Sequence, residues 1–254
     1  MSDATPVVPV SAPQEQPRGT LSRIFGALFA PVPTFRDIAR RPDWIAPLIV
    51  IFLASIVSVA VMAPRLDYDA MREKMEAQSK KNPNMTAEQQ EKAMKIGMAV
   101  GKSMMWVAPF FGLGWLALMG AIYFLGVRLA GGEGTYVGCL AISLYGQMPL
   151  VIRRLLNDVI ILTKHSVDPE KAQMLLRSNL AFLTEMKSNP AGWAALASLD
   201  IFAIWSVILM IIGFAQLPRM TRGRSAAVVI TIWVIFTLFG VGAASFAVLM
   251  RRGA

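Results

Sequence analysis

Uninterrupted apolar runs constrain this chain more than any other feature of its sequence. The hydrocarbon core of a bilayer is crossed by a helix of roughly 20 apolar residues. Because 55% of the residues are hydrophobic and only 16% are charged, the chain has too few charges to cover such runs in water. Five runs of 17 to 26 residues contain no Lys, Arg, Asp or Glu: 44–64, 103–127, 136–152, 201–218 and 225–250.

The runs predict an all-α protein. Open strands would leave backbone groups unpaired in lipid, and no segment shows the alternation of a barrel strand. The two short runs need help from flanking residues. We therefore expect a polytopic helical membrane bundle of about five transmembrane helices, with spans near 44–64, 103–127, 136–156, 194–218 and 225–250.

The residues before the first span divide into two parts. Residues 1–17 are rich in proline and lack a basic residue, which predicts a disordered tail rather than a cleaved signal peptide. Residues 18–43 form a basic, amphipathic segment whose apolar residues recur at helical spacing until Pro31 and Pro33 stop the pattern. These apolar residues are Leu21, Ile24, Phe25, Leu28 and Phe29.

This second part is a candidate interfacial helix that contacts lipid or a protein partner. Such a helix buries its apolar face at the headgroup level while its arginines reach anionic lipid. The alternative, a helix that packs against the bundle, stays open. Under the first interpretation the bundle does not need residues 1–30 to fold. The candidate contact residues are Arg18, Arg23, Phe25, Phe29, Arg36, Arg40 and Arg41.

Two polar segments, 65–102 and 164–189, predict water-exposed helical loops between the spans. In the first, Thr86 and Gln89 have the spacing of a capping box, which would begin a helix that runs into the second span. In the second, Asp168 and Pro169 suit the start of a helix.

The sharpest polar feature is a cluster in the third span together with one residue at the entrance of the fourth. Arg154 and Asp158 are four residues apart and could pair on one helix face, and Asp200 is another candidate partner for the arginines. We favour a third span that ends near Ile152, so that these groups mark the water boundary. The alternative is an intramembrane polar site. The cluster consists of Arg153, Arg154, Asn157, Asp158 and Asp200.

Residues that could carry catalysis or hold a metal are scarce. The chain has one histidine, His165, and one cysteine, Cys139, too few for a multi-histidine metal site or a disulfide. His165 falls in a polar loop outside the spans, so it offers no catalytic base at membrane depth. No phosphate-binding glycine motif occurs in a suitable context. The net charge of +9 is spread over the loops, which fits membrane electrostatics better than nucleic acid. We expect that the protein is not an enzyme and that it binds no cofactor, no metal and no nucleic acid.

Several short motifs resemble those of the Yip (Ypt-interacting) family of membrane proteins. Asp43-Trp44-Ile45-Ala46-Pro47 resembles the family's Asp-Leu-Tyr-Gly-Pro element. The stretch 143–149 is similar to its Tyr-x-x-x-Pro third span, while 33–36 and 200–205 look like bacterial members. The positions that carry the resemblance are Asp43, Pro47, Tyr145, Pro149 and Trp205.

The resemblance covers residues 31–250 and implies five spans in a bacterial inner membrane, with a cytoplasmic N-terminus. A count of Lys and Arg over whole loops favours the opposite orientation. For bacterial members the resemblance supplies no settled activity. We expect an organising or adaptor protein that acts through membrane lipids, an unknown protein partner or a second copy of itself. The alternative is a small transporter or transporter subunit with its site near Arg153, Arg154 and Asp158.

Overall fold

The computed structural model of the chain describes residues 19–79, 86–168, 172, 175–184 and 189–253. Within them the only strand-like pairings are isolated bridges, and the regular elements are helices, as predicted. The α-helices are α1 (Thr20–Phe29), α2 (Pro31–Arg40), α3 (Ile45–Met62), α4 (Tyr68–Ser79), α5 (Ala87–Leu129), α6 (Tyr136–Gly146), α7 (Met148–Leu162), α9 (Pro190–Ser198), α10 (Ile201–Phe214) and α11 (Arg222–Gly253). Two short 3₁₀ helices, η1 (Ala63–Arg65) and η2 (Leu180–Leu183), complete the described elements.

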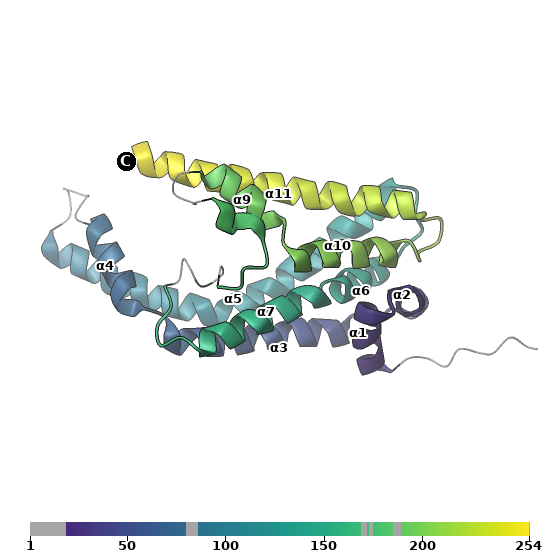
Figure 1. The fold of residues 1–254 in the computed structure, drawn as a ribbon, viewed down its shortest axis with the longest axis horizontal. Coiled ribbons are helices and arrows are strands. Elements are labelled where there is room, and N and C mark those ends of the chain that lie inside the picture. The colour runs from purple at the N-terminus through teal and green to yellow at the C-terminus, as the bar shows by residue number, and fades with distance from the viewer. Residues whose placement is uncertain (1–18, 80–85, 169–171, 173–174, 185–188, 254) are drawn as a thin grey trace, which may run out of the picture.

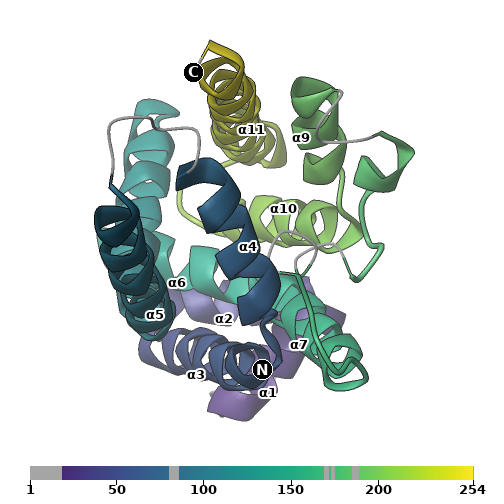
Figure 2. The ribbon, with the colours of Figure 1, turned by 90° about the vertical axis from the view of Figure 1, so that its left-hand side faces the viewer.

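The long helices lie side by side along one direction, whereas α1 crosses that direction at one end of the bundle (Figure 1). The α5–α6 and α10–α11 connections lie at the same end as α1 and α2. The opposite end carries α4 and the C-terminus, and α4 faces the viewer when the bundle is seen along its length (Figure 2). The two ends of the bundle therefore differ in the elements that they present.

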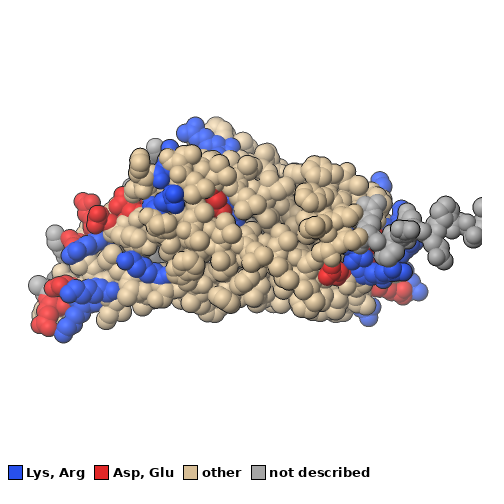
Figure 3. Space-filling model, turned by 90° about the horizontal axis from the view of Figure 1, so that it is seen from below, with Lys and Arg blue, Asp and Glu red and all other residues tan. Residues whose placement is uncertain are grey.

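The described helices are long and apolar enough to cross a membrane at four places: Ile45–Arg65, Glu88–Leu129, Tyr136–Leu162 and Arg222–Phe246. The shorter apolar helix α10 adds a fifth apolar segment. On the face shown in Figure 3, most charged side chains lie towards the two ends and the surface between them is largely uncharged. The architecture is that of a helical membrane bundle with about five spans, as the apolar runs predict.

Helix α6 forms the centre of the bundle. Its residues 138–146 are all buried, because α2, α3, α5 and α10 contact it from different sides. Small residues allow this close approach. A Cβ atom at Gly120 of α5 would lie 2.8 Å from the Leu140 Cδ1 atom, and one at Gly213 of α10 would lie 2.6 Å from the Ile142 Cγ2 atom.

Several expected boundaries need correction or addition. The amphipathic helix ends before Pro31, as expected, but Pro31 then begins a second helix, α2, because a proline at the first helical position lacks only an N–H group that would stay unbonded there. The third span is two helices joined at Gln147, with Pro149 in the first turn of α7. The fourth is also divided, because the Asp200 side chain accepts hydrogen bonds from Phe202 and Ala203 and starts α10 there.

The polar segments differ in how far they follow the prediction. Thr86 and Gln89 form the expected capping box, and α5 continues from there through the second apolar run as one helix. In the segment 164–189, Pro169 lies outside the described residues, and residues 175–184 contain bends and η2 instead of an α-helix. Here the Asn157 side chain accepts a hydrogen bond from the Leu176 backbone N–H, so bonds to α7 replace helical bonds.

Candidate functional site

The N-terminal helices form a surface that we call the α1–α2 platform, residues 20–40 at the end of the bundle (Figure 1). Helix α1 has two unlike sides. Arg23 and Ala27 face the bundle and are buried, whereas Leu21, Phe25 and Phe29 are 71%, 61% and 76% exposed. The three exposed residues are four positions apart and form one apolar stripe. One side of α1 thus packs against the bundle, as one interpretation expects. Its other side is exposed, as expected of a helix that contacts lipid or a partner.

Arg23 fixes α1 to α2 within the platform. Its Nε atom lies 2.9 Å from the Asp37 Oδ2 atom of α2, and its Nη1 atom donates to the Arg41 carbonyl oxygen at 3.2 Å. The buried Tyr145 hydroxyl of α6 lies within electrostatic range of Arg23, Asp37 and Asp43. Arg23 is therefore not an outward contact residue, because its charge is neutralised inside the protein.

Helix α2 supplies the apolar contact of the platform. Thr34, Phe35 and Ile38 are buried, and the Phe35 ring packs over Gly213 of α10, where an added Cβ atom would lie 2.8 Å from the Phe35 Cδ1 atom. Arg36 and Arg40, on the opposite side of α2, are exposed, as is Arg41. Arg18 lies outside the described residues. Of the candidate contact residues that the structure describes, all except Arg23 point outwards.

The second candidate site is the polar belt of α7, which we define as Arg153, Arg154, Asn157 and Asp158. The Arg153 Nε atom lies 3.2 Å from the Asp200 Oδ2 atom, so the alternative partner named from the sequence is the one that Arg153 takes. Arg154 donates to the Ser55 hydroxyl of α3, and the Ser58 hydroxyl donates to the Asp158 Oδ2 atom at 2.6 Å. The described ion pairs do not include Arg154 with Asp158, because each bonds α3 instead.

Asn157 of the belt and Asp200, which lies outside it, bond to the segment before α10. The Asp200 carboxylate is 3% exposed and accepts hydrogen bonds from the Ser178 hydroxyl and from two backbone N–H groups of α10. The Asn157 side chain donates to the Ala172 carbonyl oxygen at 3.2 Å. These bonds, together with those to α3, connect α7 to α3, to α10 and to the segment between α7 and α10.

The helix does not end near Ile152, while the position of the water boundary stays a prediction. Helix α7 continues to Leu162, and the belt bonds Ser55 and Ser58, which lie inside the apolar helix α3 rather than beyond its end. The helix persists because its polar side chains find partners on neighbouring helices, which lowers the cost of placing them beside apolar segments.

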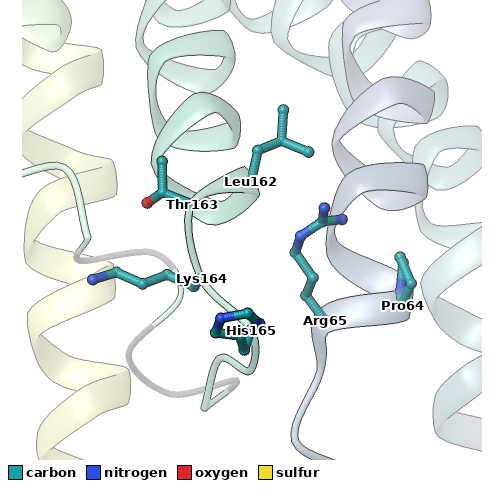
Figure 4. A pocket seen from close by; sticks show the side chains of 6 residues that line it. All are labelled: Pro64, Arg65, Leu162, Thr163, Lys164 and His165. Atoms are coloured by element: carbon teal, nitrogen blue, oxygen red, sulfur yellow. The ribbon is translucent and has the colours of Figure 1, made fainter.

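A pocket of about 350 Å³ lies between the ends of α3 and α7 (Figure 4). Its lining includes Arg65, Thr163, Lys164 and His165, the single histidine. The Arg65 Nη1 atom donates to the Val61 carbonyl oxygen at 3.2 Å, and the Thr163 hydroxyl donates to the Ile160 carbonyl oxygen at 2.7 Å. In Figure 4 the Lys164 side chain points away from Arg65, so the basic groups do not converge on one point. The pocket is a hollow at two capped helix ends.

The positions that carry the family resemblance lie mainly inside the bundle. Tyr145 and Asp43 are brought together beneath the platform. Pro47 and Pro149 are buried, and Trp205 packs against the main core. Cys139 is fully buried, and the described residues contain no group of three His, Cys, Asp or Glu that could hold a metal ion.

Sequence reasoning missed several residues that organise these two sites. Ser55 and Ser58 look like ordinary small residues of an apolar helix, although their spacing of three places both on one face. Phe35 and Ile38, which hold α2, have the same helical spacing in a segment that was expected to be a basic strip.

The fold defines a multi-pass membrane protein, and polar contacts of α7 connect several of its helices. A model of the Yip1 domain matches residues 25–244, so the chain belongs to the Yip1 domain family. The membrane protein YknW of Bacillus subtilis is 27% identical over 219 residues, which are 85% of this chain and 88% of that protein. No solved structure matches significantly.

Replacing Arg23 tests the connection of α1 to α2. Arg23→Ala leaves the Asp37 carboxylate, 19% exposed, without its ion pair, which should cost about 2 to 4 kcal/mol. We expect the melting temperature in mild detergent to fall by about 5 to 10 °C. The exposed Arg36→Ala is the matched control and should change it little. Equal effects of the two variants would show that α1 is attached loosely.

Substitutions of Asp200 test the belt. Asp200→Asn keeps the cap on α10 and loses the charge partner of Arg153, whereas Asp200→Ala loses both. We expect Asp200→Ala to lower the melting temperature most, because loss of the cap removes about a further 1 kcal/mol from the free energy of unfolding. Arg153→Ala should lower the melting temperature about as much as Asp200→Asn. The exposed neighbour Arg177→Ala serves as the control. If Asp200→Asn matched the control, the ion pair would contribute nothing to stability.

Proposed function

We propose that this Yip1-family membrane protein is a non-enzymatic organising protein whose α1–α2 platform makes its functional contact at the membrane surface. One observation carries the proposal: the stripe of Leu21, Phe25 and Phe29 is held outwards by the buried contacts of Arg23 and Ala27 on the other side of the same helix. Large apolar side chains exposed together are typical of a surface that something covers.

The position of α1 supports contact with the bilayer itself. The helix crosses the direction of the long helices at the end of the bundle, which is the orientation of a helix that lies in the membrane plane (Figure 1). Exposed arginines of α2 lie next to it and suit anionic headgroups. The transporter alternative gains no comparable support, because the bonds of Arg153, Asn157 and Asp158 connect segments of the protein to one another.

Lipid-attached quenchers test the proposal. With Cys139 replaced by Ser, a fluorophore on Phe25→Cys in nanodiscs should be quenched by nitroxides on the acyl chains and protected from aqueous iodide. The same fluorophore on Thr221→Cys, an exposed connection at the same end, should show the reverse. A label at Phe25 that iodide reaches as readily as one at Thr221 would refute the lipid contact and favour a protein partner.

We further propose that the platform faces the cytoplasm. At its end, the two short connections and the helix ends beside them carry Arg128, Arg219, Arg222 and Arg224, and short connections decide orientation more than long ones. The whole-loop count that favours the opposite orientation depends on 65–102, where much of the charge belongs to α4 and the start of α5.

Labelling of intact spheroplasts with a membrane-impermeant maleimide tests this orientation. In the Cys139→Ser background, Thr221→Cys should stay unlabelled until the membrane is opened, because it lies at the platform end. Lys164→Cys, at the far end of α7, should react at once. The opposite pattern would place the platform outside.

A further inference from the structure

The two ends of the bundle differ in the kind of basic residue that they carry. Every basic residue at the platform end is an arginine. The nine lysines lie in two other segments, 74–102 and 164–187: Lys74, Lys80, Lys81, Lys92, Lys95, Lys102, Lys164, Lys171 and Lys187. We call the exposed arginines of the platform end the arginine end: Arg36, Arg40, Arg41, Arg128, Arg219, Arg222 and Arg224.

Most of these guanidinium groups have no carboxylate partner. Arg219 pairs with Glu133 at 2.8 Å, and Asp37 is taken by the buried Arg23. Arg224 donates to the Arg219 carbonyl oxygen, and the Arg128 guanidinium lies 5.9 Å from the centre of the Phe124 ring. In the described part of the chain, the arginine end otherwise forms no ion pair, so most of its donors face outwards.

Membrane orientation alone does not account for arginine at each of these positions, since that rule counts lysine and arginine alike. The two side chains differ in how they bind. A guanidinium donates two parallel hydrogen bonds to a phosphate, whereas an ammonium acts as a point charge. A surface that carries only arginine is therefore suited to phosphate oxygens.

We infer that the arginine end binds the phosphate groups of anionic phospholipid headgroups through paired hydrogen bonds from its guanidinium groups. The inference rests on the proposed function and adds the ligand chemistry to it. The apolar stripe of α1 lies at the same end of the bundle and would enter the acyl region while the arginines stay at headgroup level (Figure 1). Charge complementarity thus selects the anionic lipids of the leaflet.

Native mass spectrometry of the full chain, titrated with phosphatidylglycerol or phosphatidylcholine, tests the inference. The charge-conserving triple variant Arg36→Lys, Arg40→Lys, Arg41→Lys should weaken phosphatidylglycerol binding about tenfold, and the corresponding glutamine variant about a hundredfold. Phosphatidylcholine has the same phosphate group beside a cationic choline, so it should bind the unmodified protein more weakly and lose affinity in the same order, with the glutamine variant weakest. The matched control is the double variant Lys92→Arg, Lys95→Arg at the other end, which should bind as the unmodified protein does.

The outcomes separate the inference from the proposed function. If the lysine triple variant binds phosphatidylglycerol like the unmodified chain, recognition by paired hydrogen bonds is refuted. A fluorophore at Phe25 that remains buried in lipid would then still support the platform as a membrane contact. Equal binding of both lipids by the unmodified protein would also refute the inference.

Discussion

Polar side chains of α7 lie beside apolar helices. Their ion pair and hydrogen bonds connect α7 to α3 and to the start of α10. Charged side chains beside apolar helices are stabilised by polar partners, and Arg153, Arg154 and Asp158 each have one on another segment of the chain. Asp200 meets Arg153 and at the same time starts α10. Ser55 and Ser58 meet the other two and fix the register of α3 against α7. One set of hydrogen bonds and one ion pair thus connect α3, α7 and α10.

The same constraint acts at the end of the bundle with a different result. Arg23 is neutralised inside the protein by Asp37, so that α1 is attached by a charge and leaves its apolar side uncovered. Phe35 over Gly213 then anchors α2 to the central helices. An amphipathic helix with this attachment cannot turn its stripe inwards without breaking the ion pair. The exposure of the stripe is therefore part of the fold.

Local patterns predicted the architecture because run length and charge content decide whether a segment can enter lipid. The capping box at Thr86 was predictable for the same reason, since its partners are three residues apart. The partners in the belt were not, because Ser58 and Asp158 are far apart in sequence and only helix packing brings them together. Arg23 was expected to contact lipid or a partner but is buried, since a periodic pattern locates apolar side chains and does not reveal which charge will be buried.

Helix α10 has a consequence for the surrounding bilayer. Its 14 residues rise about 21 Å, less than the roughly 30 Å of a hydrocarbon core, while the 32 residues of its neighbour α11 rise about 48 Å. The exposed side of α10 carries Ile201, Ile204 and Ile208, so the apolar surface that it offers to lipid is shorter than the hydrocarbon core. Local thinning of the bilayer is one of the ways in which hydrophobic mismatch of this kind is relieved. The bilayer around the protein would then be thinner on the α10 side than elsewhere, so its thickness would vary with direction around each copy.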